Sequence, residues 1–125
     1  MKYRLVERGN PANPAEPKKW YANPVNVGKF MIRDFAKEIA GRLLLTRGDI
    51  ENTLDNFPEE LPAFLKIGMS IRPGEFGTLR LNLSSEGTDT PEAFNAACIK
   101  GVKVIFTPSM ELKKALEDIP FEEAK

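Results

Sequence analysis

The side chains that could do chemistry in this chain are carboxylates and amines, because its 125 residues include no histidine and one cysteine. No imidazole base, catalytic triad or histidine-ligated metal is therefore possible, and one thiol excludes the multi-thiolate zinc sites. No glycine-rich phosphate loop is present either. Adjacent carboxylates fall where we expect exposed faces or a tail, and solvated charge explains them: Glu59–Glu60, Glu117–Asp118 and Glu122–Glu123. The residues predict a protein that is not an enzyme and that has no metal, cofactor or small-molecule substrate.

The composition is that of an ordinary globular protein, with 42% hydrophobic and 29% charged residues. No apolar run is long enough to span a bilayer, and Met1–Arg8 lacks the hydrophobic core of a signal peptide. We therefore expect a cytoplasmic protein with no membrane partner. The lone Cys98, interpreted as a small hydrophobe, agrees with a reducing compartment. Eighteen bases balance eighteen acids, so any basic face must have an acidic counterpart elsewhere.

A long helix over residues 47–66 has a clear start and a clear end in the sequence. Thr46 can cap it by accepting a backbone N–H of the first turn, and Asp49 adds a negative charge at the positive end of the helix dipole. Gly68 is the expected left-handed terminator. One apolar stripe recurs at helical spacing: Ile50, Leu54, Phe57, Leu61, Phe64 and Leu65.

Two further features concern the helical part. Pro58 and Pro62 lie inside the long helix, and each removes a hydrogen bond, which predicts a bend near Pro58 or a break into two helices. A shorter helix over residues 31–40 comes first, and three of its residues are expected to face inward: Phe35, Ile39 and Ala40.

The second half of the chain predicts strands and one more helix. The expected strands cover residues 69–72, 76–83 and 102–106. Thr107 is expected to cap a final helix that has Pro108 at its first position. Between the last two strands, residues 84–100 should be compact and partly helical, with Thr90 as a cap. The order of elements predicts an α+β fold.

The N-terminal residues read as an additional β-hairpin. Residues 2–8 alternate, with Arg4, Val6 and Arg8 on one side of the strand and Tyr3, Leu5 and Glu7 on the other. A proline-rich loop over residues 9–17 leads to a second strand over residues 18–22, where Trp20 is the expected apolar anchor. A proline-rich ligand for another protein is the alternative interpretation, and a plain loop is favoured over it.

From about Arg33 to Leu79 the chain resembles the bacterial histone-like HU/IHF family without a gap. The shared features are a helix, a Leu-Thr turn, the long helix, Gly-x-Ser, a strand and Phe-Gly-Thr. The similarity resumes at Phe106–Lys113, which resembles the family's Phe-basic-Pro-Gly-basic-x-Leu-Lys motif. The chain looks most like the divergent HU-related branch of Bacteroides-type bacteria. This resemblance divides it into an N-terminal β extension with linker (1–28), an HU-like domain (29–121) and a tail (122–125).

The resemblance implies an intertwined dimer, with helices at the base, a β saddle, and arms that reach into the DNA minor groove. Family arms are basic, whereas residues 84–99 here contain three acids and no base, which predicts a shortened or remodelled arm. Thr107 and Met110 stand where the family usually has a base. The residues themselves also favour a homodimer, because so small a domain cannot cover the helical stripe and an apolar sheet face alone.

Under this resemblance, the candidate DNA contacts are the bases of the expected sheet and final helix: Arg72, Arg80, Lys100, Lys103, Lys113 and Lys114. Ordinary surface charge is the alternative interpretation of each. Two functions stay open. The first is a nucleoid-associated, histone-like architectural protein that binds double-stranded DNA as a homodimer, weakly and without sequence preference. The second is a dimeric structural or protein-interaction module on the same scaffold with little or no DNA binding, which the zero net charge and the acidic segment favour.

Overall fold

A computed structural model describes all of residues 1–125, and the chain divides into two compact units. We call residues 1–31 together with 117–125 the terminal unit, and residues 32–116 the central unit. The sequence-based domains, with boundaries after residues 28 and 121, are not the same division as these two units. They stay a prediction.

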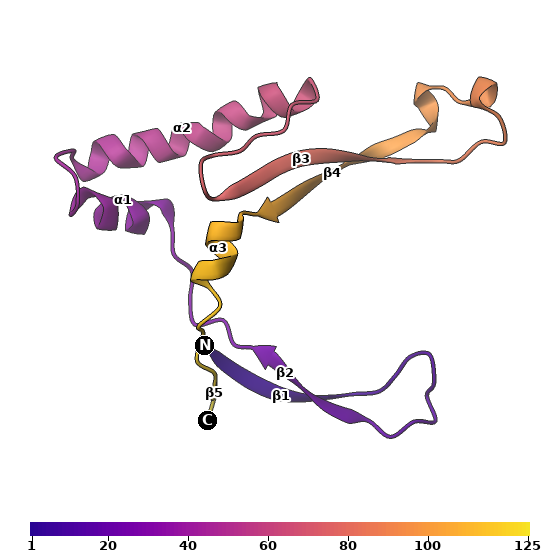
Figure 1. Cartoon of the computed structure of the whole chain (residues 1–125), viewed down its shortest axis with the longest axis horizontal. Helices are drawn as coiled ribbons and strands as arrows, with labels where there is room; N and C mark the ends of the chain where they lie inside the picture. Colours follow the sequence, from indigo (N-terminus) through magenta and orange to yellow (C-terminus); the bar gives the residue numbers. More distant parts are fainter. The chain divides into compact units, whose positions relative to one another are not determined.

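The terminal unit is a small three-stranded sheet (Figure 1). Strand β1 (Lys2–Arg8) pairs antiparallel with β2 (Lys19–Pro24) and parallel with the short β5 (Glu122–Glu123). The N-terminal ammonium group also donates a 2.6 Å hydrogen bond to the carbonyl of Pro120. The predicted N-terminal hairpin is thus present, with the C-terminal residues as its third strand.

Trp20 does not act as the apolar anchor of this hairpin. Its side chain is 64% exposed, and its direct cross-strand partner is Glu7. The expectation is wrong for the single chain because a sheet of three short strands has no second layer within its own unit to cover the indole.

The helical part of the central unit follows the sequence pattern closely. Helix α1 (Ile32–Ala40) packs against α2 (Arg47–Lys66), where Ala36 and Ile50 are the buried apolar residues. Phe35 is 49% exposed, so its predicted inward position is wrong. The contact face is centred one residue further on, at Ala36, which allows the close approach that a phenyl ring would prevent.

Both ends of α2 are closed by the residues that the sequence indicates. The Thr46 hydroxyl oxygen accepts the Asp49 N–H at 3.1 Å and also donates to the Asp49 carboxylate at 2.8 Å. At the other end Gly68 adopts a φ of +93°, and the Met69 N–H reaches back to the Phe64 carbonyl at 3.2 Å. This is the hydrogen-bond pattern that ends a helix at a left-handed residue.

Helix α2 runs without interruption through Pro58 and Pro62, so the predicted break into two helices is wrong. The two prolines are four residues apart and both are exposed, which places them on one solvent-facing side of the helix. Each costs one backbone hydrogen bond there, and the remaining turns still form the ladder.

The rest of the central unit is a two-stranded hairpin. Strand β3 (Gly77–Ser85) pairs antiparallel with β4 (Ile99–Pro108), both longer than predicted. The loop between them holds two 3-10 turns, η1 (Pro91–Ala93) and η2 (Ala96–Cys98), so the helical content expected here is 3-10 and short. The strand expected over residues 69–72 is reduced to a single bridge, in which Ile71 and Leu79 exchange two 2.8 Å hydrogen bonds.

The final helix α3 (Met110–Ala115) begins two residues later than predicted. Its cap is Ser109, which is buried, accepts the Leu112 N–H at 3.0 Å and donates to the carbonyl of Glu75. Thr107 is not the cap, because it still belongs to β4 and is paired with Thr78. Pro108 can be the last residue of β4, because pairing at the end of an edge strand does not require the backbone N–H that proline lacks.

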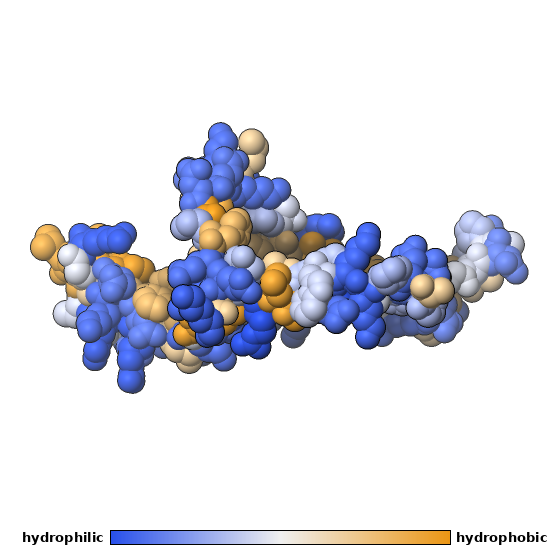
Figure 2. Space-filling view, turned by 90° about the horizontal axis from the view of Figure 1, so that it is seen from below, coloured by the Kyte–Doolittle hydropathy of each residue, from blue (hydrophilic) through white to orange (hydrophobic).

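The chain buries very little of its apolar surface. Ala36 and Ile50 are its only buried hydrophobic residues, while Phe57 and Phe64 of α2 are 43% and 47% exposed. Figure 2 shows hydrophobic side chains on the surface over the part of the central unit where α1 and α2 meet. Soluble monomers rarely leave so much contiguous apolar area uncovered.

Candidate nucleic-acid interface

The β3–β4 hairpin has one apolar and one polar face, because directly paired residues of an antiparallel ladder point to the same side. The apolar face is made by three successive pairs: Leu79 with Phe106, Leu81 with Val104, and Leu83 with Val102. The polar face is made by the pairs in between: Thr78 with Thr107, Arg80 with Ile105, Asn82 with Lys103, and Ser84 with Gly101.

Arg80 and Lys103 therefore share the polar face. They occupy diagonal positions of the ladder, since Lys103 is two residues from Ile105, the partner of Arg80. Diagonal neighbours in an antiparallel pair lie about 7–8 Å apart, within reach of one polyanionic backbone. Asn82 is the direct partner of Lys103 and lies two residues from Arg80 on the same face, where it adds an amide that can donate to a phosphate oxygen.

Arg72 lies close to the start of this face. It is exposed, its Nε donates to the Gly74 carbonyl at 3.3 Å, and it lines a shallow hollow with Thr78 and Thr107. The carboxylate-bearing Glu111 lines the same hollow. The positive charge of Arg72 therefore adds to that of the hairpin, while an acid stands beside it.

The other three candidate bases are placed differently. Lys100 is the extra residue of a β-bulge, because Ile99 pairs with Ser85 while Gly101 pairs with Ser84. Lys113 and Lys114 are exposed in the last turn of α3. Cations there also interact favourably with the negative end of the helix dipole, so their position has a structural reason independent of DNA.

The candidate bases thus form a strand-borne group and a helix-borne pair. Arg80, Lys100 and Lys103 belong to the first, and Lys113 with Lys114 to the second. Arg72 is in neither, because it lies outside the strands, in the segment that leads to β3. Asn82 and Thr78 also belong to the polar face and were not among the predicted residues. The alternation of β3 could have indicated both, since each is two residues from Arg80.

Other kinds of site have no support in the structure. No group of three or more histidine, cysteine, aspartate or glutamate side chains is placed to hold a metal ion. The chain also contains no helix with the length and apolarity needed to cross a bilayer.

Comparison with known proteins identifies one family. A family model described as "HU domain fused to wHTH, Ig, or Glycine-rich motif" (HU-HIG) matches residues 1–123. Among solved structures, the chain is similar to a protein from Bacteroides vulgatus ATCC 8482 described as a "putative bacterial DNA binding protein", with a TM-score of 0.60 and 14% sequence identity. The match covers 98% of this chain but 47% of the other, so this chain spans about half the length of that protein. No curated protein sequence matches.

The family model extends over both units, from the N-terminal hairpin to β5. The observed mixture of helices and strands is consistent with an HU-like α+β domain. The resemblance predicted from the sequence is therefore confirmed: the chain belongs to the HU-HIG family of HU-domain proteins.

Proposed function

We propose that this chain is a histone-like architectural protein that binds double-stranded DNA through the phosphate backbone. The observation that carries the proposal is the polar face of the β3–β4 hairpin, where Arg80, Asn82 and Lys103 lie together opposite an apolar face. Side chains of these types contact phosphate oxygens without reading the base sequence. The HU-domain family and the name of the similar Bacteroides vulgatus protein support the same function. Association with the nucleoid and the absence of catalysis follow as expectations.

The active form in this proposal is a homodimer, in which a second copy covers the apolar surface of the central unit. The exposed side chains of Phe57 and Phe64 line a largely apolar groove with Leu61, Met69 and Ile71. The apolar face of the hairpin is similarly uncovered, with Val102 58% and Val104 65% exposed. Burial of these side chains is the favourable contribution to association, and the lost freedom of the two chains offsets part of it.

Binding should be weak and should bend DNA little. Residues 84–99, at the far end of the hairpin, hold Glu86, Asp89 and Glu92 and no base. A negative tip repels phosphate and supplies no cation to hold a kinked duplex. A protein-interaction module is the second candidate function, and this acidic tip is the observation that favours it.

A fluorescence-anisotropy titration of a short DNA duplex at several salt concentrations tests the proposal. The logarithm of the association constant should fall linearly with the logarithm of salt concentration, because each neutralised phosphate releases counterions. The double variant Arg80→Gln, Lys103→Gln should reduce this slope by about two units. The matched control is Lys37→Gln, Lys66→Gln, which removes two exposed charges from α1 and α2 and should leave the slope unchanged. An equal loss in both variants would place the contact elsewhere, and no binding by the wild type would favour the interaction module.

A further inference from the structure

The β1–β2 hairpin of the terminal unit gathers its basic residues on one face. Its register pairs Arg8 with Lys19, Val6 with Tyr21, and Arg4 with Asn23, and these pairs share one face together with Lys2. The opposite face carries the remaining pairs: Tyr3 with Pro24, Leu5 with Ala22, and Glu7 with Trp20. We call the first of these the basic face.

Four cations lie on the basic face, and neither β1 nor β2 contributes an acid to it. The acids near it come from outside the two strands. Glu122 of β5 is the partner of Lys2, and Glu16 lies in the loop. The end of the face nearest the loop, with Arg8 and Lys19, is thus positive beside a single carboxylate.

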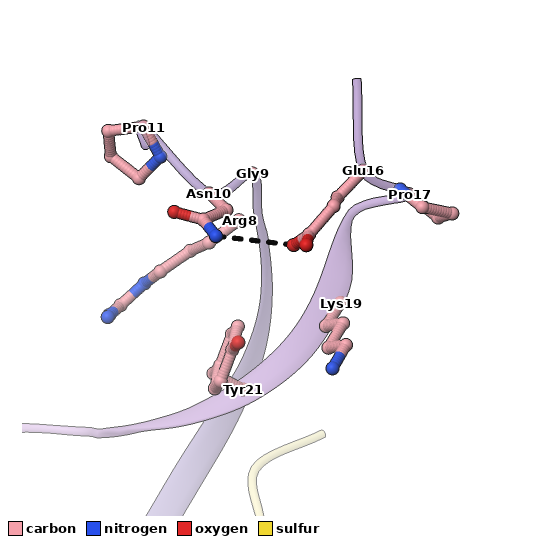
Figure 3. A pocket seen from close by; sticks show the side chains of 8 residues that line it. All are labelled: Arg8, Gly9, Asn10, Pro11, Glu16, Pro17, Lys19 and Tyr21. Carbon is pink, nitrogen blue, oxygen red and sulfur yellow. Dashed lines mark hydrogen bonds between the residues drawn. The ribbon is translucent and has the colours of Figure 1, made fainter. Parts of the chain in front are cut away.

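The carboxylate of Glu16 already has a hydrogen-bond partner in the loop. Glu16 accepts a 3.2 Å hydrogen bond from the Asn10 amide across a hollow of ≈ 300 Å³ (Figure 3). Arg8, Lys19 and Tyr21 line the same hollow. The loop therefore holds Glu16 in place, and the Arg8 side chain extends away from this carboxylate (Figure 3).

Arg8 is held in position by its neighbours. Its guanidinium carbon is 5.8 Å from the centroid of the Tyr21 ring, and one of its terminal nitrogens donates to the Asn23 side chain. A guanidinium has five N–H donors, so most of them remain for a ligand. Because the cation covers the Tyr21 ring, this ring is not free to stack on a nucleotide base. The face is suited to phosphate oxygens and not to bases.

The spacing of the cations matches an extended polyanion. Directly paired residues such as Arg8 and Lys19 have Cβ atoms about 5 Å apart. Arg4 pairs with Asn23, which is four residues from Lys19 on β2, or about 13 Å at the rise of a β-strand. The Arg8 guanidinium reaches back over the Tyr21 ring to Asn23, so its charge lies toward the Arg4 end of this row. A row of this length contacts several phosphates of one duplex at once.

We propose that the basic face of the β1–β2 hairpin is a second, sequence-independent contact with the phosphate backbone of duplex DNA. This inference rests on the proposed function, because it assigns a further surface to the same partner. In this assignment the N-terminal hairpin supplies the positive charge that the acidic tip of the β3–β4 hairpin lacks.

The test compares full-length variants on one short DNA duplex by anisotropy over a range of salt concentrations. Arg4→Gln, Lys19→Gln leaves the Arg8–Tyr21 contact intact and should lower the salt slope by about two units. The matched control, Lys29→Gln, Lys125→Gln, removes two exposed charges of the same unit outside the basic face and should leave the slope unchanged. A slope for Arg4→Gln, Lys19→Gln equal to that of the control would overturn the inference while the proposed function stands. No binding by the wild type would overturn both.

A variant that should bind DNA more tightly complements the test, because a misfolded protein would not gain affinity. Glu16→Gln keeps an oxygen that can accept from Asn10 and removes the negative charge from the hollow that Arg8 and Lys19 also line. Binding should become about two- to fivefold tighter at low salt, the range of one exposed charge contact. Unchanged affinity would contradict the inference. The same set is measured on vesicles of anionic phospholipid, and a dependence on Arg4 and Lys19 there but not on DNA would likewise overturn it.

Discussion

Phe76 and Phe106 stack at the base of the β3–β4 hairpin, with ring centroids 4.8 Å apart and planes inclined by 28°. Gly77 makes this contact possible. A Cβ on Gly77 would stand 2.5 Å from a ring carbon of Phe106 and 2.5 Å from the Thr107 carbonyl oxygen. Its φ of +154° also lies outside the range that side chains prefer. Phe76, Gly77 and Phe106 therefore act as one packing unit.

Gly77→Ala should lower the free energy of unfolding by about 1–3 kcal/mol or more, because neither the ring nor the backbone carbonyl can withdraw without disturbing the ladder. Urea denaturation followed by circular dichroism measures it. Gly87→Ala is the control, since no atom lies within 4 Å of its added Cβ, and it should change stability by less than about 0.5 kcal/mol. Equal stability of both variants would show that the stacked pair is not packed as described.

Thr46→Ala should destabilise the chain by about 1 kcal/mol, because the first turn of α2 loses the oxygen that accepts the Asp49 N–H. Thr46→Ser keeps this oxygen and should retain most of the stability. The comparison uses the same denaturation curves. A loss of stability in the serine variant as large as in the alanine variant would assign the effect to the methyl group instead of the cap.

Phe57→Ala should weaken association more than it changes the isolated chain. Phe57 is 43% exposed in one chain, so the full cost of truncating a buried phenylalanine, about 3–5 kcal/mol, is expected only if a second copy covers it. The melting temperature of the wild type should rise with protein concentration, as for a folded dimer, and that of the variant should fall well below it. Phe94→Ala is the matched control, because Phe94 is 41% exposed but lies between the two 3-10 turns. Equal effects of the two substitutions would contradict the proposed dimer surface.

Lys113→Glu, Lys114→Glu should abolish most DNA binding while the chain stays folded. Both side chains are exposed on α3, and each substitution replaces an attractive phosphate contact by a repulsive one. Reversing the charges also opposes the dipole of α3, so circular dichroism must accompany the gel shift. Undiminished binding by the folded variant would exclude the helix-borne pair from the interface.

The sequence predicted best those elements whose signals are local. Thr46, Asp49 and Gly68 each act within one turn of α2, and the predicted bounds of that helix coincide with the observed ones. The cap of α3 was mispredicted because Thr107 and Ser109 are both suitable residues two positions apart. The choice between them depends on Ser109 reaching the Glu75 carbonyl, a contact between residues 34 positions apart.

The candidate interface was predictable only in part, because it also depends on contacts between residues far apart in the sequence. The residue types of Arg80 and Lys103 are visible in the sequence, but their shared face depends on the register of two strands separated by a loop of 13 residues. The alternation of Arg4 and Arg8 was visible as well. That Lys19 joins them depends on the register of β1 and β2, which the predicted hairpin does not specify.

Sedimentation of the protein alone and with a short DNA duplex tests the central claim most directly. The account predicts a species of twice the 14.0 kDa chain mass at micromolar concentration. At low salt this species should migrate with the duplex as one dimer per site, and it should dissociate from the duplex as salt is raised. A 14.0 kDa monomer that leaves the duplex boundary unshifted at low salt would contradict both the dimer and the DNA-binding function.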